Sequence, residues 1–170
     1  MKTRLELSLL VLTGLFFLGT AAYALEVGDP APVLTANDQD GKSLSFGETY
    51  KKGVTLVYFY PKADTPGCTA EACSLRDSYE DLRAKGLQVI GVSEDKAEDQ
   101  KKFQEKYKLP FPLVADTDGA VAKAFAVTTV KGFAQRESFL VKDGKIAWHD
   151  PHASTKNQAD DVRKALENLK

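Results

Sequence analysis

Two cysteines, Cys68 and Cys73, lie five positions apart in a chain of 170 residues that has no further cysteine. Thiols at such close spacing suit nucleophilic attack by one activated sulfur or the reversible formation of a disulfide. The Cys-x-x-Cys motif of thioredoxin-like oxidoreductases has two intervening residues, whereas this pair has four. Two cysteines are also too few for a disulfide scaffold or a four-cysteine zinc site, so the pair indicates thiol chemistry.

The position of Cys68 favours a reactive thiolate. Pro66-Gly67 precedes it, and from Thr69 the apolar residues have helical spacing up to a stop at Lys85-Gly86. In the first turn of a helix, unpaired backbone N–H groups and the positive end of the helix dipole favour a negatively charged sulfur. The alternative is a buried and unreactive cysteine.

The spacing also limits how the two cysteines can bond. On a regular helix, residues five apart are separated by about 140° and by roughly 7.5 Å of rise, which exceeds the ~7 Å limit between the Cα atoms of a disulfide. Cys68 and Cys73 therefore cannot bond while the helix is intact, and a disulfide between them requires its first turns to unwind. This geometry favours a reversible switch over the alternative of a permanent structural disulfide.

The apolar pattern predicts a three-layer α/β domain. Residues 54–60 form a continuous apolar and aromatic run, typical of a strand buried on both faces of a sheet. The helix that begins near Cys68 follows, and then a second strand over 87–92, which implies a parallel crossover. The other predicted elements are a small hairpin between Leu34 and Phe46, a helix over 96–107, a strand over 111–115, a helix over 120–125, a hairpin over 138–148 with its turn at Asp143-Gly144, and a helix over 156–169.

Residues 1–24 have a different character from the rest of the chain. Lys2 and Arg4 precede an apolar stretch over 7–18, and Ala22-Tyr23-Ala24 follows it. This order is typical of a secretory signal peptide, so we expect cleavage after Ala24, a single domain over 25–170 and export, in a bacterium to the oxidising periplasm. The alternative is a segment that is retained as a membrane anchor.

Composition excludes several classes of protein. Hydrophobic residues make up 43% of the chain and charged residues 28%, as in a soluble domain with a core and unlike a disordered chain. The formal net charge of −1 leaves no excess positive field, so no nucleic-acid partner is expected. His149-Asp150-Pro151-His152 is interpreted as a surface loop after a strand, and no metal site is predicted.

The segment around the cysteines resembles the active-site segment of the peroxiredoxins, in the bacterioferritin-comigratory (peroxiredoxin Q) subgroup. The Pro-x-x-x-Thr-x-x-Cys motif of that family falls on Pro61, Thr65 and Cys68, and the resolving cysteine of the subgroup falls on Cys73. Similarity extends from residues 26–32 to residues 136–141. The resemblance implies a thioredoxin fold with a mixed central sheet and with the N-terminal additions of the peroxiredoxins.

The resemblance also implies roles for the residues with reactive or charged side chains. Cys68 would be the peroxidatic thiolate that becomes a sulfenic acid, and Cys73 would then form a disulfide with it. Arg136 matches the arginine whose guanidinium favours the thiolate and hydrogen-bonds the peroxide oxygens. Glu137 replaces the small hydroxyl residue that usually follows this arginine. Because successive side chains of a strand point to opposite faces, Glu137 is expected to point away from the Arg136 guanidinium.

Further residues of the motif are expected to form the peroxide site. The Thr65 hydroxyl can both donate and accept hydrogen bonds, which suits a peroxide with one O–H group and one bare oxygen. Pro61 would shield the sulfur from bulk water, and the amides of Gly67 and Cys68 would face the bound peroxide. Glu71, one turn into the helix, would orient the arginine, and the alternative for it is a solvated carboxylate on the helix surface.

The expected activity is a thiol peroxidase acting on hydrogen peroxide and alkyl hydroperoxides, recycled by thioredoxin or by a periplasmic thioredoxin-like reductant. No metal, flavin or haem cofactor is implied, and an internal resolving cysteine is compatible with a monomer that, after signal cleavage, has no membrane segment. Two alternatives stay open at this point. One is an exported thiol-disulfide oxidoreductase, and the other is a non-catalytic domain with a structural disulfide.

Overall fold

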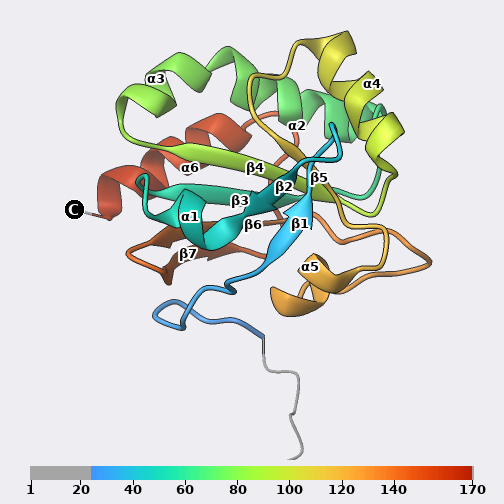
Figure 1. Ribbon diagram of the computed structural model, residues 1–170. Helices are drawn as coiled ribbons and strands as arrows, with labels where there is room; N and C mark the ends of the chain where they lie inside the picture. Colours follow the sequence, from blue (N-terminus) through green and yellow to red (C-terminus); the bar gives the residue numbers. More distant parts are fainter. Residues whose placement is uncertain (1–23, 170) are drawn as a thin grey trace, which may run out of the picture.

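The computed structural model describes residues 24–169, so the predicted signal peptide over 1–24 lies outside the described residues except for Ala24. A five-stranded sheet with the order β5-β4-β3-β6-β7 crosses the centre of this part of the chain (Figure 1). Strand β3 pairs in parallel with β4 and antiparallel with β6, so the sheet is mixed, as predicted. The strands are β3 (Thr55–Phe59), β4 (Gln88–Ser93), β5 (Leu113–Ala115), β6 (Glu137–Lys142) and β7 (Lys145–Asp150).

Helices cover both faces of the sheet, which confirms the prediction of a three-layer α/β domain (Figure 1). One face is covered by α2 (Pro66–Asp77), α3 (Tyr79–Ala84), α4 (Ala97–Tyr107) and α6 (Gln158–Asn168). The other face is covered by α1 (Phe46–Tyr50), α5 (Ala120–Ala124) and a small sheet of β1 (Thr35–Asn37) and β2 (Ser43–Ser45).

Strand β3 lies at the centre of the core because all five of its residues are buried. Leu56 and Tyr58 pack among the apolar side chains of α2, α3, α4 and α6, whereas Val57 and Phe59 pack against the layer that contains α1 and α5. This alternation agrees with the predicted strand that is buried on both faces. The sheet thus provides a rigid support for the loop that leaves the end of β3.

Two predicted turns are present. Asp143 and Gly144 have φ values of 53° and 72°, the left-handed conformations that a tight hairpin requires, and they join β6 to β7. The predicted small hairpin near the N-terminal end of the described residues is the pair β1 and β2, with Gly41 at a φ of 71° in its turn.

The predicted helix up to Lys85-Gly86 is wrong in one respect, because it is interrupted at Ser78 and forms two helices, α2 and α3. Ser78 leaves helical geometry with φ −105° and ψ 5°, and its carbonyl accepts the first bond of the next helix, from the amide of Leu82 at 3.0 Å. Leu75 and Leu82 are both fully buried, so the apolar spacing continues across the break and conceals it in the sequence.

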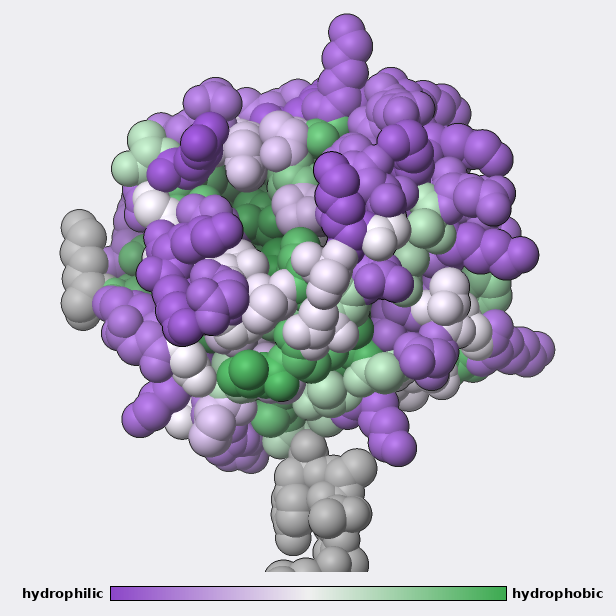
Figure 2. All heavy atoms as spheres, viewed as in Figure 1, coloured by the Kyte–Doolittle hydropathy of each residue, from purple (hydrophilic) through white to green (hydrophobic). Residues whose placement is uncertain are grey.

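The surface of the described residues has both polar and apolar parts. Figure 2 shows hydrophilic residues over most of one face, with hydrophobic residues gathered in its central hollow. The exposed large hydrophobic side chains of residues 24–169 are those of Val27, Val33, Val130 and Phe133. Within residues 24–169, every helix is too short or too polar to cross a bilayer.

Candidate active site

Cys68 lies in the first turn of α2, as predicted. The chain leaves β3 through a loop, Thr65 is the residue before the helix, and Pro66 is the first helical residue. Proline suits this position because its fixed φ fits a helix and its missing N–H would have no partner in the helix. The Cys68 side chain is buried, with 2% of the residue exposed. Its sulfur therefore lies near the free amides of the helix N-terminus and away from bulk water.

Arg136 reaches the sulfur of Cys68 from a distant part of the sequence. Its Nη2 atom lies 3.3 Å from the Cys68 Sγ atom and donates a hydrogen bond to it. The sheet explains this contact, because Glu137 pairs with Phe59 in register and so places Arg136 beside the end of β3. The carbonyl of Arg136 accepts a bond from the Ala153 amide at 3.3 Å, which holds its backbone in place. One cationic side chain thus contacts the buried sulfur directly.

The prediction for Glu137 is confirmed. Its carboxylate points away from the Arg136 guanidinium and lies 2.9 Å from Nε2 of His149. The prediction that His149 belongs to a surface loop is wrong, because His149 is part of β7 and its ring stacks on Phe139 at a centroid distance of 4.2 Å. Strand β7 continues to Asp150, two residues beyond the predicted hairpin. The Glu137 carboxylate therefore contacts a side chain of the neighbouring strand β7 and does not draw the Arg136 guanidinium away from Cys68.

Glu71 is fully buried one turn after Cys68, so the alternative of a solvated carboxylate is wrong. Its Oε2 atom forms an ion pair with Nη1 of Arg136, while Nη2 of the same guanidinium contacts Cys68. Burial raises the pKa of the Glu71 carboxyl to about 8, although the positive charge of Arg136 and its hydrogen bond act in the opposite direction. The guanidinium is thus shared between two acidic groups that face it from successive turns of α2.

This burial predicts that Glu71 makes stability depend on pH. The pKa of Glu71 is about 8 in the folded protein and 4.5 without the protein environment, so the folded state binds the extra proton between these values. The stability that this proton contributes is fully present below about pH 4.5 and is lost as the pH rises toward 8. We expect the Glu71→Gln variant to lack this loss. Relative to the wild type, its free energy of unfolding should rise by on the order of 4 kcal/mol between pH 4.5 and 8.

Urea unfolding of the wild type and of Glu71→Gln at several pH values measures this difference. The Glu80→Gln variant is a matched control, because Glu80 is an exposed carboxylate on α3. Its difference from the wild type should not change with pH over the same range. A constant difference between the wild type and Glu71→Gln would contradict the prediction.

Gly67 leaves room for the guanidinium. A Cβ atom built on Gly67 would lie 3.4 Å from Nη2 of Arg136 and 3.5 Å from the methyl group of Thr155. A side chain at this position would therefore press on the group that contacts Cys68. The structure also places Thr155, which the sequence did not indicate, beside the start of α2.

Thr65 and Pro61 lie in the loop before Cys68, and both are half-buried. The Thr65 hydroxyl donates to the carbonyl of Lys62 at 3.0 Å, which uses its one proton and leaves its oxygen lone pairs free to accept. The Thr65 carbonyl accepts the first helical bond, from the amide of Thr69 at 2.8 Å. The amides of Gly67 and Cys68 precede that bond in the first turn, where a helix leaves its N–H groups without intrahelical partners.

Cys73 lies on the same intact helix as Cys68, and both are free thiols. Cys73 is half-buried, whereas Cys68 is buried. Because α2 is continuous from Pro66 to Asp77, the helical rise between the two residues is about 7.5 Å, as expected for a pair that cannot bond in this conformation.

Other functional groups were missed by sequence reasoning. The hydroxyl of Tyr58 is fully buried, and burial raises its pKa well above the usual value, so the phenol stays protonated. Asp95 accepts a hydrogen bond from the Ala63 amide in the loop before Cys68, and the side chains of Ser93 and Gln100 support Asp95. The signal for Ser93 and Asp95 was their place at the end of a buried strand parallel to β3 and two residues beyond it, at the same sheet edge as Pro61.

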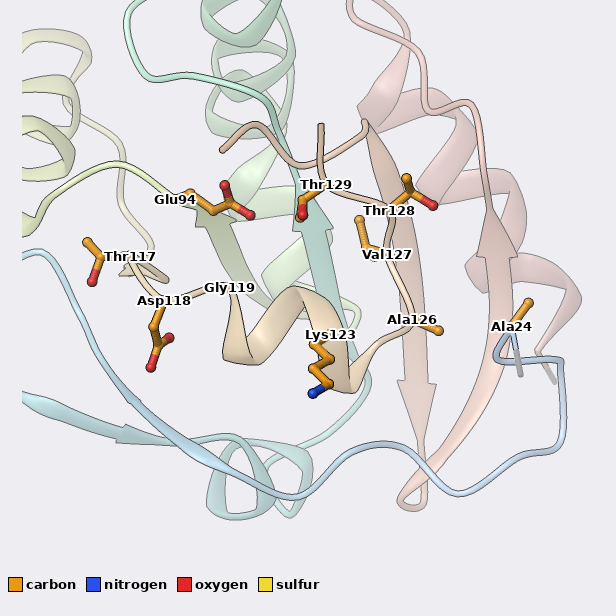
Figure 3. Close-up of a pocket in the computed structure, with 10 residues that line it drawn as sticks. All are labelled: Ala24, Glu94, Thr117, Asp118, Gly119, Lys123, Ala126, Val127, Thr128 and Thr129. Carbon is orange, nitrogen blue, oxygen red and sulfur yellow. The ribbon is translucent and has the colours of Figure 1, made fainter. Parts of the chain in front are cut away.

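A separate pocket of about 760 Å³ lies beside α5. Figure 3 shows its lining from the loop after β4, from α5 and from residues 126–129. None of the predicted site residues lines it. Within residues 24–169, no group of three or more His, Cys, Asp or Glu side chains is arranged to hold a metal ion.

Comparisons with known proteins agree with this geometry. A family model described as the AhpC/TSA family matches residues 27–149. The chain is 42% identical over 146 residues to peroxiredoxin Bcp of Escherichia coli, an alignment that covers 81% of this chain and 93% of the relative.

Two solved structures are similar over most of the described residues. Peroxidoxin BcpB from Mycobacterium tuberculosis superposes with a TM-score of 0.81 at 29% identity, covering 86% of this chain and 99% of the other. A bacterioferritin comigratory protein of Xanthomonas campestris, described for its alkyl peroxide reduction activity, has a TM-score of 0.77 at 26% identity, with 85% and 100% covered. The predicted thioredoxin-type fold of the peroxiredoxins is therefore confirmed.

Proposed function

Because the chain belongs to the AhpC/TSA family and is a thiol peroxidase of the Bcp/peroxiredoxin Q group, we propose that Cys68 is its peroxidatic residue and Cys73 its resolving residue. The observation that carries this assignment is the 3.3 Å contact between Nη2 of Arg136 and the buried Cys68 sulfur at the start of α2. Among the described residues, no arginine donates a hydrogen bond to the Cys73 sulfur, and Cys73 is more exposed than Cys68. The two thiols therefore have different surroundings, as different roles require.

In the first step, the thiolate of Cys68 attacks one oxygen of the hydroperoxide. An S–O bond forms, the O–O bond breaks, and the departing oxygen takes a proton to leave as water or an alcohol, while Cys68 becomes a sulfenic acid. Arg136 and the amides of Gly67 and Cys68 donate hydrogen bonds to the oxygens as negative charge moves onto them. Thr65 accepts the hydrogen bond of the peroxide O–H group with its free lone pairs, and Pro61 covers the sulfur.

In the second step, Cys73 attacks the sulfur of the sulfenic acid. The S–O bond breaks, water leaves, and a Cys68–Cys73 disulfide forms. Because the helical geometry keeps the two residues apart, the first turns of α2 unwind before this attack. An external dithiol then reduces the disulfide, and the helix re-forms with two free thiols.

The substrates and partners follow from the same chemistry. Hydrogen peroxide and alkyl hydroperoxides both have the O–O bond that the mechanism needs, and the Xanthomonas campestris relative is described for alkyl peroxide reduction. A thioredoxin-like protein is the proposed reductant. An exported thiol-disulfide oxidoreductase is not favoured, because the relatives are named peroxiredoxins.

Location and assembly belong to the proposal as well. The basic and apolar N-terminal sequence ending in Ala22-Tyr23-Ala24 supports a signal peptide over 1–24 and a domain over 25–170. Export to a periplasm would require a periplasmic reductant. Because both cysteines lie on one helix of one chain, the cycle needs no second subunit, which supports a monomer.

A stoichiometric experiment with the Cys73→Ser variant tests the proposed function. Reduced wild-type protein mixed with one equivalent of hydrogen peroxide should lose both thiols and give a monomer mass lower by two hydrogens. Cys73→Ser should consume one equivalent at an unchanged initial rate, stop at a sulfenic acid, and show no thioredoxin-dependent turnover. Rapid mixing with thiol titration and mass spectrometry measures both. Slow peroxide loss by the wild type, at the rate of an ordinary thiol, would refute the proposed function.

A further inference from the structure

The loop between β3 and α2 is fixed by a carboxylate from the neighbouring strand. The amide of Ala63 donates a hydrogen bond to Oδ2 of Asp95 at 2.7 Å. Asp95 lies two residues beyond β4, which runs parallel to β3, so both segments leave the sheet at the same edge. This bond joins the residues that lead into Cys68 to an element that lies outside α2.

A chain of buried side chains holds Asp95 in turn. The hydroxyl of Ser93 donates to Oδ2 of Asp95 at 2.8 Å, and Nε2 of Gln100 donates to that hydroxyl oxygen at 2.8 Å. The same Nε2 atom also donates to the carbonyl of Val114 on β5 at 2.9 Å. The hydroxyl of Tyr60 donates to Oε1 of Gln100. Apart from the bond to Val114, the donors of Tyr60, Gln100 and Ser93 all point toward the carboxylate, so this series of hydrogen bonds is cooperative in direction.

This series of hydrogen bonds begins and ends in the segment between β3 and α2. Tyr60 follows β3 directly, and Ala63 comes three residues later, so the segment between them is held at both ends. Tyr60, Ser93 and Gln100 are fully buried, where water cannot replace a lost partner. The loop position is thus set by a polar network whose supporting side chains lie in the core, while Asp95 and Ala63 themselves are half-buried.

Hydrogen bonds within the loop relate the position of Ala63 to those of Thr65 and Cys68. The Thr65 hydroxyl bonds the carbonyl of Lys62, which is the neighbour of Ala63. Asp64 adopts a left-handed φ of 58°, a conformation that costs energy for a residue with a side chain and that a fixed loop must maintain. The Asp64 carboxylate also pairs with Lys106 at 2.7 Å, but this pair is exposed and contributes little.

We propose that Asp95 is a positioning residue for peroxide reduction: by holding the Ala63 amide, it fixes the loop that presents the Thr65 hydroxyl and the Cys68 sulfur to the peroxide. The inference rests on the proposed role of Cys68. Asp95 acts through the loop and does not touch the reacting atoms. Catalysis is sensitive to such positioning, because a displacement of about 1 Å can lower a rate by about 100-fold.

The position of the hydrogen bond between Ala63 and Asp95 predicts which step of the reaction its loss affects. Ala63 lies before α2, whereas the attack of Cys73 on the sulfenic acid requires the turns after Pro66 to unwind. The bond between Ala63 and Asp95 is therefore needed to hold the reduced site together, and it is not needed once the helix has unwound. Loss of Asp95 should slow the formation of the sulfenic acid and should not slow the formation of the disulfide.

Rapid mixing of reduced protein with hydrogen peroxide, followed by acid quench, thiol trapping and mass spectrometry, separates the two steps. We expect Asp95→Ala to form the sulfenic acid about 10- to 100-fold more slowly than the wild type. Asp95→Asn should show a smaller loss, because an amide oxygen still accepts the Ala63 bond but without the charge. Asp99→Ala is the matched control, since Asp99 is an exposed acid of α4 with one distant ion pair at 3.8 Å.

The outcomes separate this inference from the proposed function. A wild type that does not react rapidly with peroxide refutes the proposed function. A reactive wild type with Asp95→Ala as fast as Asp99→Ala overturns the role of Asp95. Equal slowing of both steps also overturns it, because it would indicate a general loss of structure in α2. If Asp95→Ala does not fold, Asp95→Asn provides the test, with equality to Asp99→Ala again counting against the proposal.

Discussion

Replacing Cys68 with serine is expected to abolish peroxide consumption, with a loss on the order of 10⁴-fold or more, the scale seen when a catalytic nucleophile is removed. A serine hydroxyl is not ionised at neutral pH and is a poor nucleophile toward a peroxide oxygen. Cys73 cannot replace the lost sulfur, because Arg136 donates to the Cys68 position and not to the Cys73 thiol. Peroxide loss after rapid mixing, measured with excess reductant and without it, gives the rate.

The Cys73→Ser variant shows whether this loss of activity is specific to Cys68. Cys73→Ser carries the same chemical change five residues later on the same helix and should keep the first turnover. Thermal unfolding of both variants shows whether α2 is intact. Consumption of peroxide by Cys68→Ser at a rate near that of Cys73→Ser would mean that the reactive thiol has been assigned to the wrong residue.

The Arg136→Met variant is expected to reduce peroxide about 10²- to 10³-fold more slowly, a loss of roughly 3–4 kcal/mol of transition-state stabilisation. Methionine removes the donor that lies 3.3 Å from the sulfur and leaves the buried Glu71 carboxyl without its cation. Arg136→Lys should fall between this variant and the wild type, because an ammonium keeps the charge but cannot contact both groups with a planar fork. Stopped-flow measurement of the second-order rate constant compares the three proteins.

Two controls separate chemistry from stability in this experiment. Arg163→Met removes an arginine of α6 that pairs with Asp81 and Asp160, away from Cys68, and should leave the rate unchanged. The double variant Glu71→Gln/Arg136→Met no longer buries an unpaired acid, so it should recover stability while its rate stays low. A rate for Arg136→Met within about threefold of the wild type would contradict the proposed role of the guanidinium.

Much of the fold could be predicted from the sequence because its signals are local. The uninterrupted apolar run of β3 and the Asp143-Gly144 turn each indicate one conformation without knowledge of the rest of the chain. Pro66-Gly67 before a helical pattern placed Cys68 in a first turn in the same way. Helix α1 was missed because its five residues show no periodic pattern, whereas the equally short α5 follows a recognisable Asp118-Gly119 turn.

The parts of the site that the sequence did not predict depend on packing between distant segments. Asp95 follows a strand as many solvated acids do, and only the parallel pairing of β3 and β4 places its carboxylate against the Ala63 amide. His149 looked like part of a loop because a histidine and an acid at the end of an apolar run are typical of a surface. Its stacking on Phe139 depends on the register of β6 with β7.

The interruption at Ser78 has a consequence for how far a structural change can spread. If α2 and α3 were one rod, melting its first turns would weaken hydrogen bonds along a single cooperative unit. Instead, a separate series of helical hydrogen bonds begins at Ser78 and forms α3. Helix α3 packs on the core through the fully buried Leu82 and through Tyr79, whose ring lies 5.7 Å from that of Phe111. We expect the two helices to be separate units of local unfolding. We therefore expect oxidation to open the segment that holds both cysteines, while the amides beyond Ser78 keep their native protection from hydrogen exchange.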